Sequence, residues 1–184
     1  MKNNRILVLI ASCFFLLNSY GQKYLTQNGE VEIYSKTDLF LIDGKNVKVT
    51  SILDAASGDV GASLVIRSFK FDEAQLEEHF NENYMSSHLF PKAEFKGKIT
   101  NISSVNFSKD GTYPIQIEGV MEIHGKKNPM KADGKIVVKR GTVKASTKFN
   151  IAPKLYNVKV EEKYKDRIKD NIQITVNFDY QKMK

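Results

Sequence analysis

Apolar and polar residues alternate along most of the chain, so that one side of each segment is hydrophobic. The clearest example is 172–180, where Ile172, Ile174, Val176 and Phe178 alternate with polar side chains. A β-strand produces this period of two because successive side chains point to opposite faces. The same alternation runs through 93–99, 113–123, 130–138 and 143–149, and upstream through Val31 and Ile33, Val47 and Val49, and Leu64 and Ile66. We therefore predict about eight strands.

Short turn sequences separate these strands and predict antiparallel neighbours. They are Asp43-Gly44, Ser57-Gly58-Asp59, Lys109-Asp110-Gly111 and Arg140-Gly141.

Two segments lack the alternation. Residues 72–87 have helical spacing, with Asp72 as the expected N-cap and Leu76, Phe80 and Tyr84 on one stripe. The charged segment 161–170 predicts either a short helix or a solvated loop.

The pattern predicts an all-β fold. Sequential antiparallel strands with one apolar face form either a two-sheet sandwich or a closed barrel, and long, even strands favour the barrel. We expect an antiparallel barrel of about eight strands, with the short helix at or near one end. A barrel of this size can hold one small ligand. Small residues at inward positions either leave a lumen or fit the taper of a packed core; they are Ala93, Gly97, Gly119, Ala132, Gly134 and Ala145.

The first 21 residues have the order of parts found in secretory signal peptides. Lys2 and Arg5 precede an apolar run over 6–17, which is shorter than the roughly 20 residues that span a bilayer. We expect cleavage near Gly21-Gln22, one exported domain over 22–184, and a periplasmic or secreted location. The rival interpretation is a lipoprotein acylated at Cys13. It is disfavoured because the apolar run continues beyond that cysteine.

Composition narrows the chemistry. The formal charge of +7 falls to +5 without Lys2 and Arg5, which favours anionic partners or transient contact with a membrane surface but is no signature of nucleic acid binding. The chain beyond Gln22 has no cysteine and no nucleophile elbow or phosphate-cradling glycine loop. His79, His88 and His124 have no metal-ligand spacing. We predict no catalytic site, cofactor or metal.

Two pairs of motifs are more specific. The first pair is HFNENYMSS at 79–87 with FPKAEFKGKI at 90–99, and the second is GTYPI at 111–115 with GVMEIHG at 119–125. Together they resemble the YceI-like family of exported polyisoprenoid-binding proteins, in its compact form. The resemblance implies a lipocalin-like barrel whose apolar lumen holds an extended isoprenoid chain, without catalysis. The chain departs from the family pattern at YSKT (34–37) and EEHF (77–80), where histidine-containing signatures are usual.

The expected ligand is a lipophilic small molecule of the isoprenoid class, stored or transported. Its tail would be held by burial of apolar area, at about 25 cal/mol per Å². We predict as ligand-binding residues Val31, Ile33, Leu64, Ile66, Phe80, Tyr84, Phe95, Ile117, Met121, Phe149, Ile174 and Phe178. A phosphate head group would need cations at the mouth, for which Arg67, Lys126, Lys127 and Arg140 are candidates. The alternative is an envelope structural or protein-interaction barrel with a packed interior.

Overall fold

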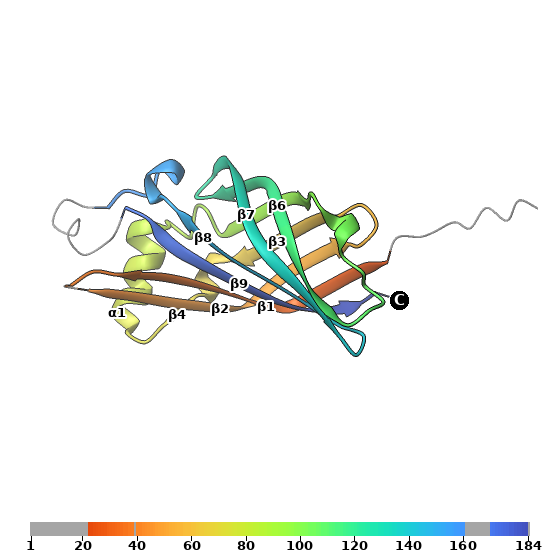
Figure 1. The fold of residues 1–184 in the computed structure, drawn as a ribbon. Coiled ribbons are helices and arrows are strands. Elements are labelled where there is room, and N and C mark those ends of the chain that lie inside the picture. The colour runs from red at the N-terminus through yellow and green to blue at the C-terminus, as the bar shows by residue number, and fades with distance from the viewer. Residues whose placement is uncertain (1–21, 39, 161–169, 184) are drawn as a thin grey trace, which may run out of the picture.

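The structure, a computed structural model, describes residues 22–38, 40–160 and 170–183. Most of its regular structure is antiparallel sheet (Figure 1). The strands are β1 (Lys23–Lys36), β2 (Leu41–Asp54), β3 (Asp59–Val65), β4 (Lys70–Phe71), β5 (Lys92–Ile99), β6 (Gly111–Ile123), β7 (Lys126–Lys139), β8 (Thr142–Ile151) and β9 (Ile172–Lys182). The helical elements are η1 (Ile66–Ser68), α1 (Ala74–His79), η2 (Phe80–Tyr84), η3 (Ile102–Ser104) and η4 (Pro153–Tyr156).

Eight of the described strands close into a barrel. Their spatial order is β1-β9-β8-β7-β6-β5-β3-β2, and β2 pairs again with β1. The two-residue β4 adds to β2 at Gly44 and Lys45. Each of these eight strands is paired on both sides over at least part of its length, as closure into a barrel requires. The predicted all-β antiparallel barrel with one short helix is confirmed.

Buried side chains pack together at one end of the barrel. This end carries the C-terminus and the β7–β8 turn (Figure 1). Ile136, Val138 and Val143 are almost inaccessible to solvent there. The Tyr24 ring stacks on Phe107, with ring centroids 5.4 Å apart. This half of the barrel is therefore an ordinary hydrophobic core.

α1 and η2 cover the opposite end. Phe80 packs edge-on against Phe69 and tilted against Phe71, with centroids 5.4 and 5.0 Å apart. The predicted helix is confirmed, but its predicted cap is wrong: the N-cap position is Glu73, and it makes no side-chain capping hydrogen bond. The last turn, η2, is π-helical, with Met85 N–H donating to the Phe80 carbonyl.

Two predictions about β2 are wrong. Asp43-Gly44 is not a turn, because the strand runs through it. A Cβ on Gly44 would lie 2.5 Å from the Phe71 ring, so this glycine makes room for an aromatic side chain. Val47 does not share the inward face of Val49. A bulge between the Gly29–Val49 and Val31–Asn46 pairs gives β2 one extra residue, which leaves Val47 50% exposed.

The remaining strand and turn predictions have mixed outcomes. Ile66 is buried as expected, but it lies in η1 and not in a strand. Arg140-Gly141 is confirmed as a two-residue turn with positive φ at both residues. The predicted leader at 1–21 and the segment 161–169 lie outside the described residues. None of the helices in the described part of the chain has the length and hydrophobicity needed to cross a bilayer.

Candidate ligand-binding site

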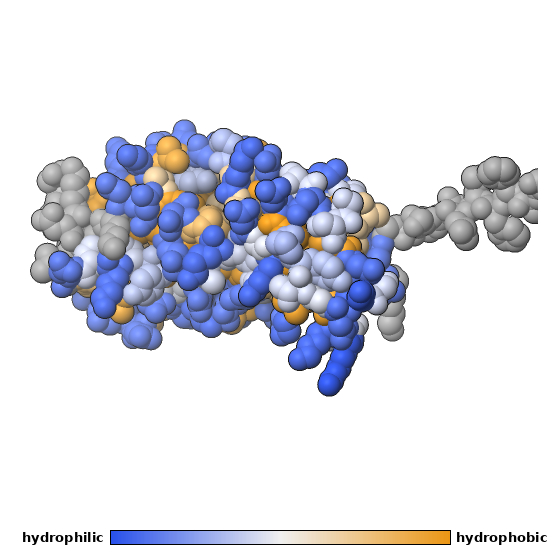
Figure 2. All heavy atoms as spheres, viewed as in Figure 1, coloured by the Kyte–Doolittle hydropathy of each residue, from blue (hydrophilic) through white to orange (hydrophobic). Residues whose placement is uncertain are grey.

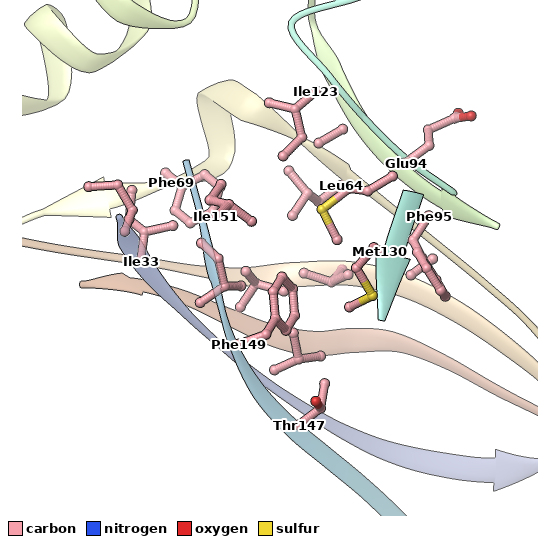
Figure 3. Close-up of a pocket in the computed structure, with 18 of the residues that line it drawn as sticks. Ile33, Leu64, Phe69, Glu94, Phe95, Ile123, Met130, Thr147, Phe149 and Ile151 are labelled. Carbon is pink, nitrogen blue, oxygen red and sulfur yellow. The ribbon is translucent and has the colours of Figure 1, made fainter. Parts of the chain in front are cut away.

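An apolar cavity of about 250 Å³ lies in the half of the barrel beneath α1 and η2. Its wall combines inward side chains of the strands with residues of α1, η2 and η4. Figure 3 shows aliphatic, aromatic and thioether groups around the space, whereas the carboxylate of Glu94 points away from it. An apolar cavity of roughly 150 Å³ already stays dry and binds a small aromatic molecule. The barrel is therefore hollow at one end, in a form suited to an apolar guest.

A buried pair of hydroxyl groups joins Ser51 to Tyr180, and Tyr180 lines the cavity. Tyr180 Oη lies 2.7 Å from Ser51 Oγ, and Ser51 Oγ donates to the Gly61 carbonyl at 2.8 Å. Because the serine proton is used on Gly61, the tyrosine hydroxyl donates to Ser51. Burial raises the pKa of Tyr180 to about 12, although its hydrogen bond with Ser51 lowers it. This pair of hydroxyl groups is therefore uncharged at neutral pH.

Four of the six small residues predicted at inward positions have one of two roles: they widen the cavity or make room for a side chain in its wall. Ala93 and Ala145 line the cavity. Gly97 and Gly119 pair across β5 and β6, and the Phe95 ring covers them. A Cβ on either glycine would lie within 2.7 Å of that ring. The alanines thus widen the cavity, while the glycines admit an aromatic side chain that forms its wall.

One side of the wall lacks backbone hydrogen bonds. β7 and β8 pair from Lys139–Thr142 only as far as Gly134–Thr147. Beyond that point Met130 of β7 and Phe149 of β8 both line the cavity, without strand pairing between them. We name this part of the wall, where β7 and β8 are not paired, the β7–β8 seam.

η4 lies beside this seam and is tied to the β6–β7 turn. Asn128 Nδ2 donates to the Leu155 carbonyl at 2.8 Å. His124 Nδ1 lies 3.1 Å from the Tyr156 carbonyl oxygen. The buried Tyr156 lines the cavity from the same short helix.

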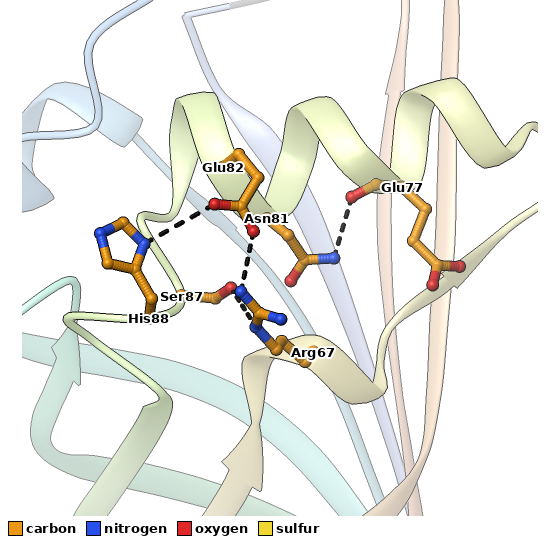
Figure 4. A network of polar contacts seen from close by, with 6 residues as sticks. All are labelled: Arg67, Glu77, Asn81, Glu82, Ser87 and His88. Atoms are coloured by element: carbon orange, nitrogen blue, oxygen red, sulfur yellow. Dashed lines mark hydrogen bonds and ion pairs between the residues drawn. The ribbon is translucent and has the colours of Figure 1, made fainter.

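A polar network holds the helical cover in place from outside (Figure 4). Arg67 donates to Ser87 Oγ at 3.0 Å and to Glu82 Oε1 at 2.8 Å. His88 Nδ1 lies 3.7 Å from the other Glu82 oxygen. Asn81 Nδ2 donates to the Glu77 carbonyl, while its buried Oδ1 has no partner among the described residues. Exposed ion pairs of this kind contribute at most about 1 kcal/mol.

All twelve predicted ligand-binding residues lie along the cavity lining. Ten come from the barrel strands and η1, while Phe80 and Tyr84 come from the helical cover. Their contact with a ligand remains a prediction.

The four candidate head-group cations do not converge. Arg67 is engaged by Glu82 and Ser87, and Lys126 and Lys127 begin β7 beside its turn with β6. Arg140 lies in the β7–β8 turn, at the opposite end of the barrel, and its backbone N–H donates to Asp110.

Several lining residues were missed by the sequence analysis. Leu76 lies on the predicted helical stripe, and Met130 lies in the predicted alternating strand 130–138. The spacing of apolar residues could therefore have identified both as lining residues. Pro153, Tyr156 and Val158 lie in a segment without clear periodicity, so the spacing of apolar residues could not identify them as lining residues. Across the described residues, no three His, Cys, Asp or Glu side chains are grouped so that they could hold a metal ion.

Comparisons with known proteins agree with this architecture. A family model described as a YceI-like domain matches residues 25–180. A polyisoprenoid-binding domain from Saccharophagus degradans, implicated in plant cell wall breakdown, superposes with a TM-score of 0.76 at 8% identity, covering 89% of this chain and 99% of that one. No curated protein sequence matches the chain.

Two further solved structures share the fold. BcnA from Burkholderia cenocepacia has a TM-score of 0.68 at 16% identity, covering 83% of this chain and 96% of its own. The YceI protein of Campylobacter jejuni has a TM-score of 0.54 at 15% identity, covering 77% and 84%. At these identities the likeness concerns the fold.

Proposed function

The chain belongs to the YceI-like family, and on that basis we propose that it binds a lipophilic small molecule with an extended apolar tail, an isoprenoid by preference. The observation that carries the proposal is the apolar cavity of about 250 Å³ inside a closed barrel. The protein would store or carry its ligand after export, as the leader-like sequence at 1–21 suggests.

The cavity favours recognition of a hydrocarbon tail over recognition of a polar group. Its lining has few polar side chains, and Ser63, Ser146 and Thr147 are the small ones among them. Each methylene moved from water into such a site contributes about 0.8 kcal/mol. Affinity would therefore rise with chain length until the cavity is full.

An isoprenoid suits the branched lining. Isoleucine, valine and methionine side chains alternate with aromatic rings such as Phe95 and Phe149, which leaves an irregular apolar surface for methyl branches. The structural neighbour from Saccharophagus degradans is described as polyisoprenoid-binding, and this supports the same ligand class here. The proposal assigns no reaction to the protein.

The test is to extract the purified protein with organic solvent and identify the released lipids by mass spectrometry. We expect a prenyl lipid in stoichiometric amount, or uptake of added geranylgeraniol by protein purified empty. A protein that releases no lipid and takes up no prenyl alcohol would contradict the proposal. That result would favour the alternative, an interaction module of the cell envelope.

A further inference from the structure

Two strongly exposed leucines lie at the end of the barrel that α1 and η2 cover. Leu89 is 65% exposed in the loop after η2, and Leu155 is 57% exposed in η4. They are the two most exposed large apolar side chains in the part of the chain that the structure describes. Neither side chain helps to fill the core.

The segments that carry these leucines meet at the β6–β7 turn. The Phe90 ring, next to Leu89, packs on the His124 ring with centroids 4.4 Å apart. His124 in turn lies 3.1 Å from the Tyr156 carbonyl oxygen, next to Leu155. We name the surface formed by 86–91, 124–128 and 152–160 the rim face.

The rim face is basic. Its three segments contain four lysines and no aspartate or glutamate: Lys126, Lys127, Lys154 and Lys159. Lys127 lies 3.5 Å from Glu122 of the neighbouring β6, so one of the charges is partly compensated. Figure 2 shows an apolar group of atoms over η4, at the top of the molecule, bordered by hydrophilic residues.

The rim face is continuous with the cavity. Pro153, Tyr156 and Val158 line the cavity, while Leu155 of the same segment points to solvent. The β7–β8 seam, which lacks backbone pairing beyond Gly134–Thr147, runs beside this segment. A molecule held against the rim face would thus stand next to the least strongly bonded part of the barrel wall.

We propose that the rim face docks on the surface of a bilayer containing anionic lipids. The two leucines enter the interface, and the lysines lie among the lipid phosphates. A bilayer fits this surface because the two exposed leucine side chains stand apart from each other among lysines. They do not form a groove that could hold a protein chain. Docking would let a membrane lipid pass into the cavity through the seam, and this consequence alone rests on the proposed function.

The test is co-sedimentation of the full chain with vesicles of equimolar phosphatidylglycerol and phosphatidylcholine. The double variant Leu89→Ser/Leu155→Ser should bind these vesicles at least about tenfold more weakly than the wild type. The matched control is Val47→Ser/Ile52→Ser, which removes two exposed apolar side chains from β2. The control should bind as the wild type does, and Lys126→Glu/Lys154→Glu should abolish binding.

Two results would overturn the docking proposal. One is equal binding of the wild type and the leucine variant; the other is wild-type binding that is no stronger to anionic vesicles than to pure phosphatidylcholine. A leucine variant that changes only the oligomeric state would overturn it too, since the rim face would then be a subunit contact. Uptake of geranylgeraniol in detergent, without vesicles, tests the proposed function separately. Uptake without vesicle binding refutes docking alone, whereas vesicle binding without uptake supports docking and refutes the carrier function.

Discussion

The hydroxyl groups of Tyr180 and Ser51 form a buried hydrogen-bonded pair inside the barrel. Tyr180 is only 6% exposed and lines the cavity, and its hydroxyl donates to a serine that in turn donates to the Gly61 carbonyl. A buried polar group is tolerated when it is hydrogen-bonded, and this chain satisfies both hydroxyls.

The stability of the fold should depend on the ionisation of Tyr180. Burial raises its pKa from 10.0 to about 12, so above pH 10 the unfolded chain loses the proton while the folded chain keeps it. The stability present below pH 10 should therefore fall by roughly 3 kcal/mol as the pH rises through 12. Denaturant unfolding at a series of alkaline pH values measures this loss.

Tyr180→Phe is the control for that titration. Tyr24 and Tyr156 also have pKa values raised by burial, so the variant should keep part of the alkaline loss but show a shallower slope. At neutral pH the variant should lose about 1 kcal/mol with the hydrogen bond. An alkaline slope identical to that of the wild type would exclude Tyr180 as its main source.

Single residues also show where sequence reasoning fails. The Asp43-Gly44 pair has the composition of a turn, but Gly44 is required by the Phe71 ring, which reaches it from β4. That contact is tertiary and leaves no trace in the local sequence. By contrast, Arg140-Gly141 is a turn because both residues take positive φ, a local property that the sequence does signal.

The pairing of β1 with β2 also has a feature that the local sequence does not predict. Alternation predicts which strands exist, but it does not predict the bulge in β2 that turns Val47 outward. Asn46 stabilises the bulge, since its Oδ1 accepts from Lys48 N–H and its Nδ2 donates to the Val65 carbonyl. Asn46 is fully buried, but in the sequence it falls on the polar side of the Val47/Val49 alternation and so gives no sign of the bulge.

The pairing of β5 with β6 depends on glycine at its centre. A Cβ on Gly119 would lie 2.6 Å from Gly97 Cα and 2.7 Å from the Phe95 ring. Gly119→Ala should therefore cost about 1–3 kcal/mol through overpacking and should displace Phe95 from the cavity wall. Thermal unfolding measures the loss.

Gly61→Ala on the adjacent β3 is the matched control. The nearest atom to its added Cβ would be 3.9 Å away, so this change should be neutral or slightly stabilising. Equal melting temperatures for the two alanine variants would show that the Gly97–Gly119 contact is not tightly packed.

The whole molecule combines a solid half with a hollow half. The sequence predicts the barrel, the helix at its end and the inward residues, because each follows from periodicity and closure. It does not predict how far side chains fill the interior, because that depends on contacts such as those among Phe95, Gly97 and Gly119. Segment 152–160 lines the cavity without regular alternation, so its role too emerges only in three dimensions.

Calorimetric titration with farnesol at several temperatures, for the wild type and Ala145→Phe, tests the ligand-binding cavity most directly. Ala145 lines the cavity, so its replacement by phenylalanine should fill the space, whereas Lys148→Phe adds a ring on the exposed face of the same strand. We expect one farnesol per wild-type chain with a negative heat-capacity change, because apolar surface is buried. The Lys148→Phe protein should bind equally, and Ala145→Phe should not bind. No binding by the wild type, or undiminished binding by a folded Ala145→Phe protein, would contradict the account.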